Sequence, residues 1–166
     1  MALSLGEPRI ITRGPYRVVG AWCAYEGEDE GPGWNGAYEA LASRLGEIVG
    51  RCDDLMLGLL YRPHKDDPTL PKAVRACFVG VDVHESVPVP DGLAATRFSG
   101  GQYVLVDCIG DTPGEAAEGV GQAIDWLTEW LPAHGYREGD ACFAASRSGA
   151  PRPPWVETVY IKLEPA

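Results

Sequence analysis

The chain has 166 residues, of which 45% are hydrophobic and 23% charged, a composition typical of a globular protein with a sizeable core. Its formal net charge of −10 repels phosphate backbones, which argues against direct binding of nucleic acid and favours cationic partners. No run approaches the roughly 18 apolar residues that span a membrane, and the N-terminus lacks the apolar core of a signal peptide, so we expect a soluble cytoplasmic protein.

The first half of the chain predicts the element order strand, helix, strand, strand. Residues 9–25 are rich in β-branched and aromatic side chains, as expected for a strand. Residues 34–50 carry an apolar stripe at helical spacing, which predicts a helix. Apolar runs at 55–62 and 74–85, separated by a loop that contains prolines, predict two further strands.

The same order recurs in the second half. Residues 94–110 predict a strand, which glycines near its middle could break. A helix follows with a clear start, because Thr112 can cap it, Pro113 suits its first turn and Glu115 completes a capping box. Two strands close this half, over residues 141–147 and 155–163.

The repeated order predicts an α+β fold with an antiparallel sheet, made of a duplicated strand–helix–strand–strand unit. We expect a single domain over 1–166 with two pseudo-repeats, about 9–86 and about 94–164. Each half alone would leave one face of a small sheet exposed. Together the halves can bury these faces and leave a central ligand cleft along the seam.

Most patterns that suggest catalysis have a simpler explanation. The five cysteines show no C-x-x-C spacing, and most lie in apolar runs, which indicates reduced core residues rather than a metal site. Asp82 and His84 share one face of a strand and could form an acid/base pair, but a solvated strand end explains them more simply. We expect neither a metal nor a cofactor, since no ligand spacing or phosphate-loop motif occurs.

Aromatic side chains, which occur on nearly every predicted element, are the most suggestive group. Core packing can explain any one of them, but indole and phenol groups need hydrogen-bond partners when they are buried. A cleft lined by several rings is a good receptor for flat or cationic organic molecules. The rings that we expect to line it are those of Trp34, Tyr38, Tyr61, Trp126, Phe143 and Trp155.

Glu157 interrupts the apolar run WVETVYIKL of the last predicted strand. Alternation places Glu157 on one face with Trp155 and Val159, which favours an inward side chain that faces the cleft. There the carboxylate would neutralise a bound cation, or its pKa would be raised and it would act as an acid. A bulge after the preceding PRPP run would shift the register by one residue.

Short motifs carry a resemblance to a known family. The stretch LAATRFSGGQYVLVDCIGDTPGEAAEGVGQAIDWLTEWLPAHGYREGD contains a small-Gly-x-Tyr strand, a turn and a helix that ends in Trp-Leu-Pro, and WVETVYIKL adds a closing strand with a glutamate. With RGPYRVVG, LGLLYRPHKDDP and KAVRACFVGV in the first half, the chain resembles the GyrI-like small-molecule-binding family. It departs from the family in its Gly-Asp-Thr turn and in Thr158, which stands where the family often has its glutamate.

The resemblance implies a duplicated strand–helix–strand–strand fold with a central aromatic cleft and an acidic residue. Members bind lipophilic, often cationic, drugs, usually beside a DNA-binding domain, and this chain resembles the stand-alone members. The leading hypothesis is a binding protein for aromatic, cationic, lipophilic small molecules, with Glu157 as the counter-charge. One alternative is a cofactor-free hydrolase of cyclopropane-type natural products that uses Glu157 and Tyr61, and another is an interaction protein similar to inhibitors of DNA gyrase.

Overall fold

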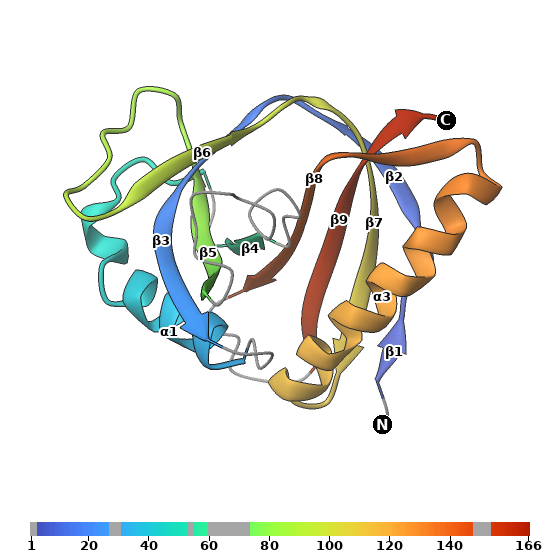
Figure 1. The fold of residues 1–166 in the computed structure, drawn as a ribbon, viewed down its shortest axis with the longest axis horizontal. Coiled ribbons are helices and arrows are strands. Elements are labelled where there is room, and N and C mark those ends of the chain that lie inside the picture. Colours follow the sequence, from blue (N-terminus) through green and yellow to red (C-terminus); the bar gives the residue numbers. More distant parts are fainter. Residues whose placement is uncertain (1–2, 27–30, 53–54, 60–73, 148–153) are drawn as a thin grey trace. The chain divides into compact units, whose positions relative to one another are not determined.

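The computed structural model describes residues 3–26, 31–52, 55–59, 74–147 and 154–166, and the chain forms two compact units. The first unit combines Met1–Pro15 with Phe98–Ala166, and the second comprises Tyr16–Arg97. Each unit joins antiparallel strands to one long helix (Figure 1). The α+β class predicted from the sequence is therefore confirmed.

The sheet of the first unit has β7 and β9 side by side, with β8 on the other side of β9. Two short strands, β1 and β2, pair with the free edge of β7, and all of these pairs are antiparallel. The elements are β1 (Ser4–Leu5), β2 (Arg9–Arg13), β7 (Gly101–Gly110), α3 (Pro113–Ala133), β8 (Tyr136–Arg147) and β9 (Trp155–Pro165).

Helix α3 begins where the sequence predicts. The Thr112 hydroxyl accepts a hydrogen bond from the Glu115 backbone N–H at 3.1 Å, and the Glu115 carboxylate accepts one from the Asp111 N–H at 2.7 Å. These bonds satisfy donors that every helix start leaves without a partner. The helix ends just after Pro132, and Gly135 supplies the left-handed conformation with φ of 81°.

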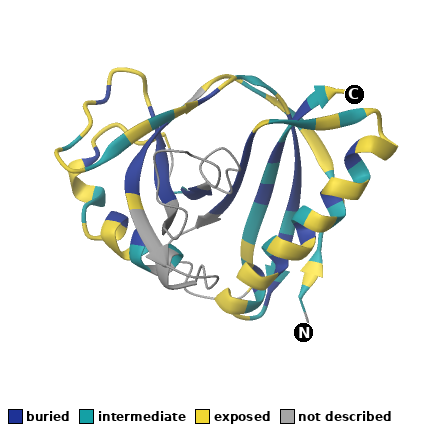
Figure 2. Ribbon diagram, viewed as in Figure 1, coloured by how far each residue is buried: buried dark blue, intermediate teal, exposed yellow. Residues whose placement is uncertain are grey.

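Helix α3 covers one face of the first unit's sheet with an apolar stripe. Its outer side is exposed, while β7 and β9 are mostly buried or half-buried (Figure 2). The buried helix residues recur every three or four positions, as one face of a helix requires. They are Ala116, Gly119, Ala123, Leu127 and Leu131.

Two glycines of α3 test this packing. A Cβ at Gly119 would lie 2.8 Å from the Cβ of Cys108 and 2.7 Å from the Leu3 side chain, whereas a Cβ at Gly121 meets nothing within 4 Å. We expect Gly119→Ala to lower the free energy of unfolding by about 1 to 3 kcal/mol through overpacking. Gly121→Ala should raise it by about 0.5 to 1 kcal/mol, since alanine is the better helix former. Urea unfolding of both variants measures the difference, and equal effects would contradict the packing.

The second unit has the strand order β4-β5-β3-β6. β3 and β5 pair in antiparallel register over ten residue pairs, from Arg17 opposite Val83 to Glu26 opposite Val74. The elements are β3 (Tyr16–Glu26), α1 (Gly31–Ala42), the 3-10 helix η1 (Leu45–Glu47), β4 (Leu55–Leu59), β5 (Val74–Val83) and β6 (Ala94–Phe98), whose last residue belongs to the first unit.

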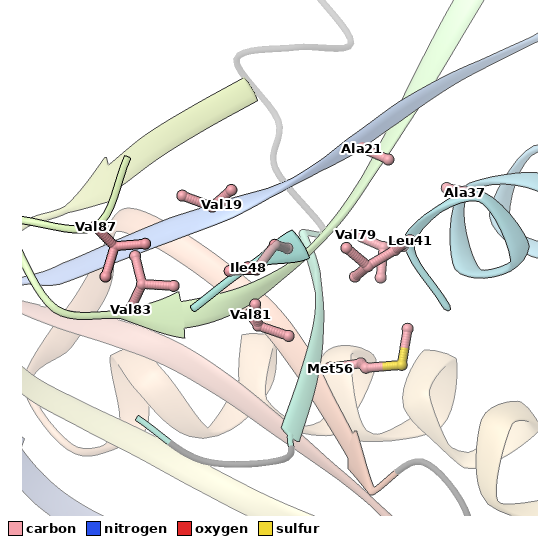
Figure 3. Packing of buried hydrophobic residues seen from close by; sticks show 10 residues of the cluster. All are labelled: Val19, Ala21, Ala37, Leu41, Ile48, Met56, Val79, Val81, Val83 and Val87. Carbon is pink, nitrogen blue, oxygen red and sulfur yellow. The ribbon is translucent and has the colours of Figure 1, made fainter. Parts of the chain in front are cut away.

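An apolar cluster between α1 and the sheet forms the core of the second unit (Figure 3). Ala37 and Leu41 of α1 are fully buried against Val79 of β5, and Ile48, just after η1, is 3% exposed in the same cluster. Burial of aliphatic side chains is the main term that stabilises such a unit. Ile48 therefore anchors the chain between η1 and β4.

Two predicted elements have different bounds in the structure. The strand expected over 9–25 is two strands, interrupted at Gly14 and Pro15, and β2 pairs with β7 whereas β3 pairs with β5. Proline has no N–H for a sheet, so it suits the junction. The helix expected over 34–50 ends at Ala42, and a short 3-10 turn follows it. Of the helices that the structure describes, none combines the length and the apolar character needed to cross a membrane.

Candidate functional site

The register of β9 decides which side chains share a face of the first unit's sheet. Cys108 pairs with Glu157, and their neighbours Asp107 and Thr158 pair on the opposite face. Because a Cβ at Gly119 of α3 would nearly touch the Cys108 Cβ, the Cys108 face is the one that α3 covers. We call the opposite face the far face, and it comprises Arg9, Tyr103, Leu105, Asp107, Phe143, Thr158, Tyr160 and Lys162.

Aromatic rings stack on the far face. The ring centroids of Phe143 and Tyr160 are 4.7 Å apart at an interplanar angle of 14°, and those of Phe98 and Phe143 are 5.5 Å apart at 13°. The Tyr103 ring packs against Phe143 at 6.0 Å, and its hydroxyl donates to the carbonyl oxygen of Ser99. Phe98, Tyr103 and Phe143 are buried and Tyr160 is half-buried. Among these four rings, Tyr160 is therefore the most accessible.

A carboxylate lies beside this stack. Arg9 donates to Asp107 Oδ2 at 2.8 Å, and the Thr158 hydroxyl donates to Asp107 Oδ1 at 2.7 Å. Burial raises the pKa of Asp107, but the hydrogen bonds from Arg9 and Thr158 outweigh it, so the pKa lies below its ordinary value. Asp107 is therefore ionised at neutral pH. Thr158 is two residues from Tyr160 on β9, which places the charge next to the last ring.

A second polar group lies at the other end of the stack. Lys162 contacts the Ser99 hydroxyl, and its ammonium is 3.4 Å from Asp140. The Ser99 hydroxyl donates to Asp140 at 2.9 Å. The far face thus has apolar rings in its middle and charged groups at both ends. Such a surface suits an amphipathic ligand with an aromatic body.

Glu157 lies on the face that α3 covers. Burial raises its pKa to about 7, and no described residue donates a hydrogen bond to its carboxyl group or forms an ion pair with it. Its neighbour Cys108 is fully buried, and burial, followed by the charge of Glu157, raises the pKa of that thiol to about 12. Glu157 is therefore a half-buried acid that changes charge near neutral pH.

The predicted site residues are divided between the two units. In the first unit, Phe143 lies on the far face, whereas Trp155 pairs with Gly110 on the face of Glu157, and Trp126 belongs to α3. In the second unit, the rings of Trp34 and Tyr38 pack against the core cluster and approach Gly58. Tyr61 lies outside the described residues. Among the predicted site residues that the structure describes, Phe143 is the one that belongs to the ring stack of the far face.

Sequence reasoning did not find the two most telling residues of the far face, Asp107 and Tyr160. Two features of the sequence could have indicated them. Asp107 is the single acid in the apolar run YVLVDCIG, and Tyr160 is two residues from Thr158, so that both share one face of the strand. Only the pairing of β7 with β9 brings them together. The described residues include no group of three or more His, Cys, Asp or Glu side chains that could hold a metal ion.

Comparison with solved structures shows the same fold in other proteins. SAV2435, in a structure with bound tetraphenylphosphonium, matches with a TM-score of 0.64 at 10% identity over 96% of this chain and 94% of that one. EcmrR, in a complex with DNA, matches with a TM-score of 0.63 at 11% identity over 96% of this chain and 58% of that one. A hydrolase from Listeria innocua matches with a TM-score of 0.52 at 11% identity over 95% and 92%.

Sequence comparison supplies the family. No curated protein matches the chain. The model of a GyrI-like small molecule binding domain, in contrast, matches residues 6–164. This range includes every described helix, both central strands of each sheet, and the far face. The chain therefore belongs to the family of GyrI-like small molecule binding domains.

Proposed function

We propose that the protein binds a lipophilic organic cation against the far face, with Asp107 as the counter-charge and Tyr160 as the stacking ring. One observation carries this proposal: an ionised carboxylate lies beside a stack of aromatic rings on one sheet face. The tetraphenylphosphonium bound to SAV2435 supports the class of ligand, since that protein shares the fold. We further propose a cytoplasmic location, where such a cation would meet the protein.

The chemistry of the far face suits a cation with aromatic groups. Stacked rings present π faces that attract positive charge, and a nearby carboxylate adds a direct Coulomb attraction. Arg9 now neutralises Asp107, and Arg9 is largely exposed at the edge of the sheet. A bound cation would therefore compete with Arg9 for the carboxylate. We therefore expect the loss of Asp107 to lower the affinity for the cation and the loss of Arg9 to raise it.

We expect Asp107→Asn to weaken binding of tetraphenylphosphonium about tenfold, because the counter-charge is lost while Arg9 remains. Arg9→Gln should strengthen binding, since it leaves the carboxylate free for the ligand. Isothermal titration calorimetry measures both, with neutral triphenylphosphine oxide as the matched ligand whose affinity should change little. Asp125→Asn, on the exposed side of α3, serves as the charge-matched control.

The same titration tests the counter-charge that the sequence predicted. If Glu157→Gln abolishes the preference for the cation and Asp107→Asn does not, Glu157 is the counter-charge and the far-face assignment is wrong. If wild-type protein binds neither tetraphenylphosphonium nor the oxide, the proposed ligand class is wrong. Hydrolysis with Glu157 and Tyr61 stays a prediction, because Tyr61 lies outside the described residues. A protein partner similar to DNA gyrase also stays a prediction.

A further inference from the structure

A thiol and an imidazole lie together in the second unit. The Cys52 Sγ is 3.9 Å from Nδ1 of His84, and both side chains are exposed. The backbone holds the pair in place: the Cys52 N–H donates to the Asp82 carbonyl oxygen at 2.8 Å, and the His84 N–H donates to the Gly50 carbonyl oxygen at 3.4 Å. Arg51 and Val83 accordingly form an isolated antiparallel β-bridge beside the end of β5.

A surface hollow adjoins the thiol. Its volume is about 570 Å³, and it is lined by the chain from η1 to Cys52. Its lining is mixed, with the apolar side chains of Leu45 and Val49 beside polar backbone and side-chain groups, and Val49 is 73% exposed. Ile48 is anchored in the core cluster of the unit, which holds this lining against the sheet (Figure 3). The hollow has room for a small molecule with an apolar body, and Cys52 is on its lining.

Basic residues lie beside the pair on the backbone. Arg51 precedes Cys52 and is exposed, and Arg17 donates to the carbonyl oxygens of His84 and Val87, at 3.4 and 2.5 Å. Nearby cations and an imidazole stabilise the thiolate form, which is the nucleophile of cysteine chemistry. Asp82, which is 7% exposed, is the acidic residue of the adjacent strand. Of the cysteines whose side chains the structure describes, Cys52 is exposed, whereas Cys108 and Cys142 are buried.

We propose that Cys52, with His84 as its general base, is a covalent capture site for electrophilic small molecules of the α,β-unsaturated carbonyl class. His84 takes the thiol proton, and Sγ adds to the β-carbon of the electrophile. The carbon–carbon π bond breaks as the carbon–sulfur bond forms, and its electrons give an enolate. The imidazolium then returns the proton to the α-carbon, so the thioether adduct forms without any further reactant. The apolar part of the electrophile occupies the hollow.

Alkylation kinetics with N-methylmaleimide test the pair. We expect peptide mapping by mass spectrometry to find a rapid adduct on Cys52, and none on the buried Cys108 and Cys142. The rate at pH 7 should exceed that of free glutathione, and His84→Gln should lower it about tenfold and move the midpoint of the pH–rate profile upward. His134→Gln, at the exposed end of α3, is the matched control and should leave the rate unchanged.

The hollow is tested by a larger probe of the same reactivity. The ratio of the N-benzylmaleimide rate to the N-methylmaleimide rate should be larger for the protein than for glutathione. Val49→Asp should remove this difference and leave the circular dichroism spectrum unchanged. Equal rates for wild type and His84→Gln, or a Cys52 no more reactive than glutathione, would overturn the proposal. The test is separate from the cation titration, since Cys52 and the far face belong to different units.

Discussion

Glu157→Gln is expected to raise the free energy of unfolding by about 2 to 3 kcal/mol at pH 8, and by less than about 1 kcal/mol at pH 5. Burial raises the pKa of Glu157 from 4.5 to about 7, so its carboxylate is costly to ionise in the folded protein. Glutamine has the same shape as the neutral acid and cannot ionise. The substitution therefore removes a penalty that exists only at higher pH.

The sign of the pH dependence follows from proton binding. The folded state holds the Glu157 proton more tightly than the unfolded state, so the contribution to stability is complete below pH 4.5 and is lost as the pH rises to about 7. Urea unfolding at pH 5, 6, 7 and 8 measures this loss in wild type and its absence in Glu157→Gln. Glu118→Gln, on the exposed side of α3, is the control. Parallel stability curves for wild type and Glu157→Gln would show that Glu157 is solvated.

Gly20→Ala is expected to destabilise the second unit by more than about 3 kcal/mol. Gly20 of β3 lies opposite Gly80 of β5, and a Cβ at Gly20 would be 2.5 Å from the Gly80 Cα and 2.7 Å from the Val79 carbonyl carbon. These are backbone atoms, which move only if the strands separate. The substitution should therefore disrupt the pairing of the two longest strands of this unit.

Thermal unfolding followed by circular dichroism measures this effect. Gly46→Ala is the matched control in the same unit, because a Cβ there meets nothing within 4 Å. The control should melt within a few degrees of wild type, whereas Gly20→Ala should melt far lower or fail to fold. A melting temperature for Gly20→Ala close to that of the control would mean that β3 and β5 do not approach as closely as described.

Features that depend on neighbouring residues were predictable from the sequence. The start of α3 follows from Thr112, Pro113 and Glu115, whose capping bonds span at most four residues. The α+β class follows from alternation and helical periodicity in segments of about ten residues. The break between β2 and β3 was missed, although Gly14 and Pro15 mark it, because apolar alternation continues on both sides. Local periodicity does not show that a strand changes its partner.

Local patterns in the amino-acid sequence are sufficient to predict an acidic chain, most of its helices and strands, and two alternating faces in the last strand. The choice of the face that α3 covers is a property of the tertiary structure, which places Glu157 on the helix-covered face and Thr158 on the far face. The reason is that alternation defines two faces but does not distinguish them. Strand register and helix packing make that choice, through contacts such as Thr158 with Asp107, which are 51 residues apart.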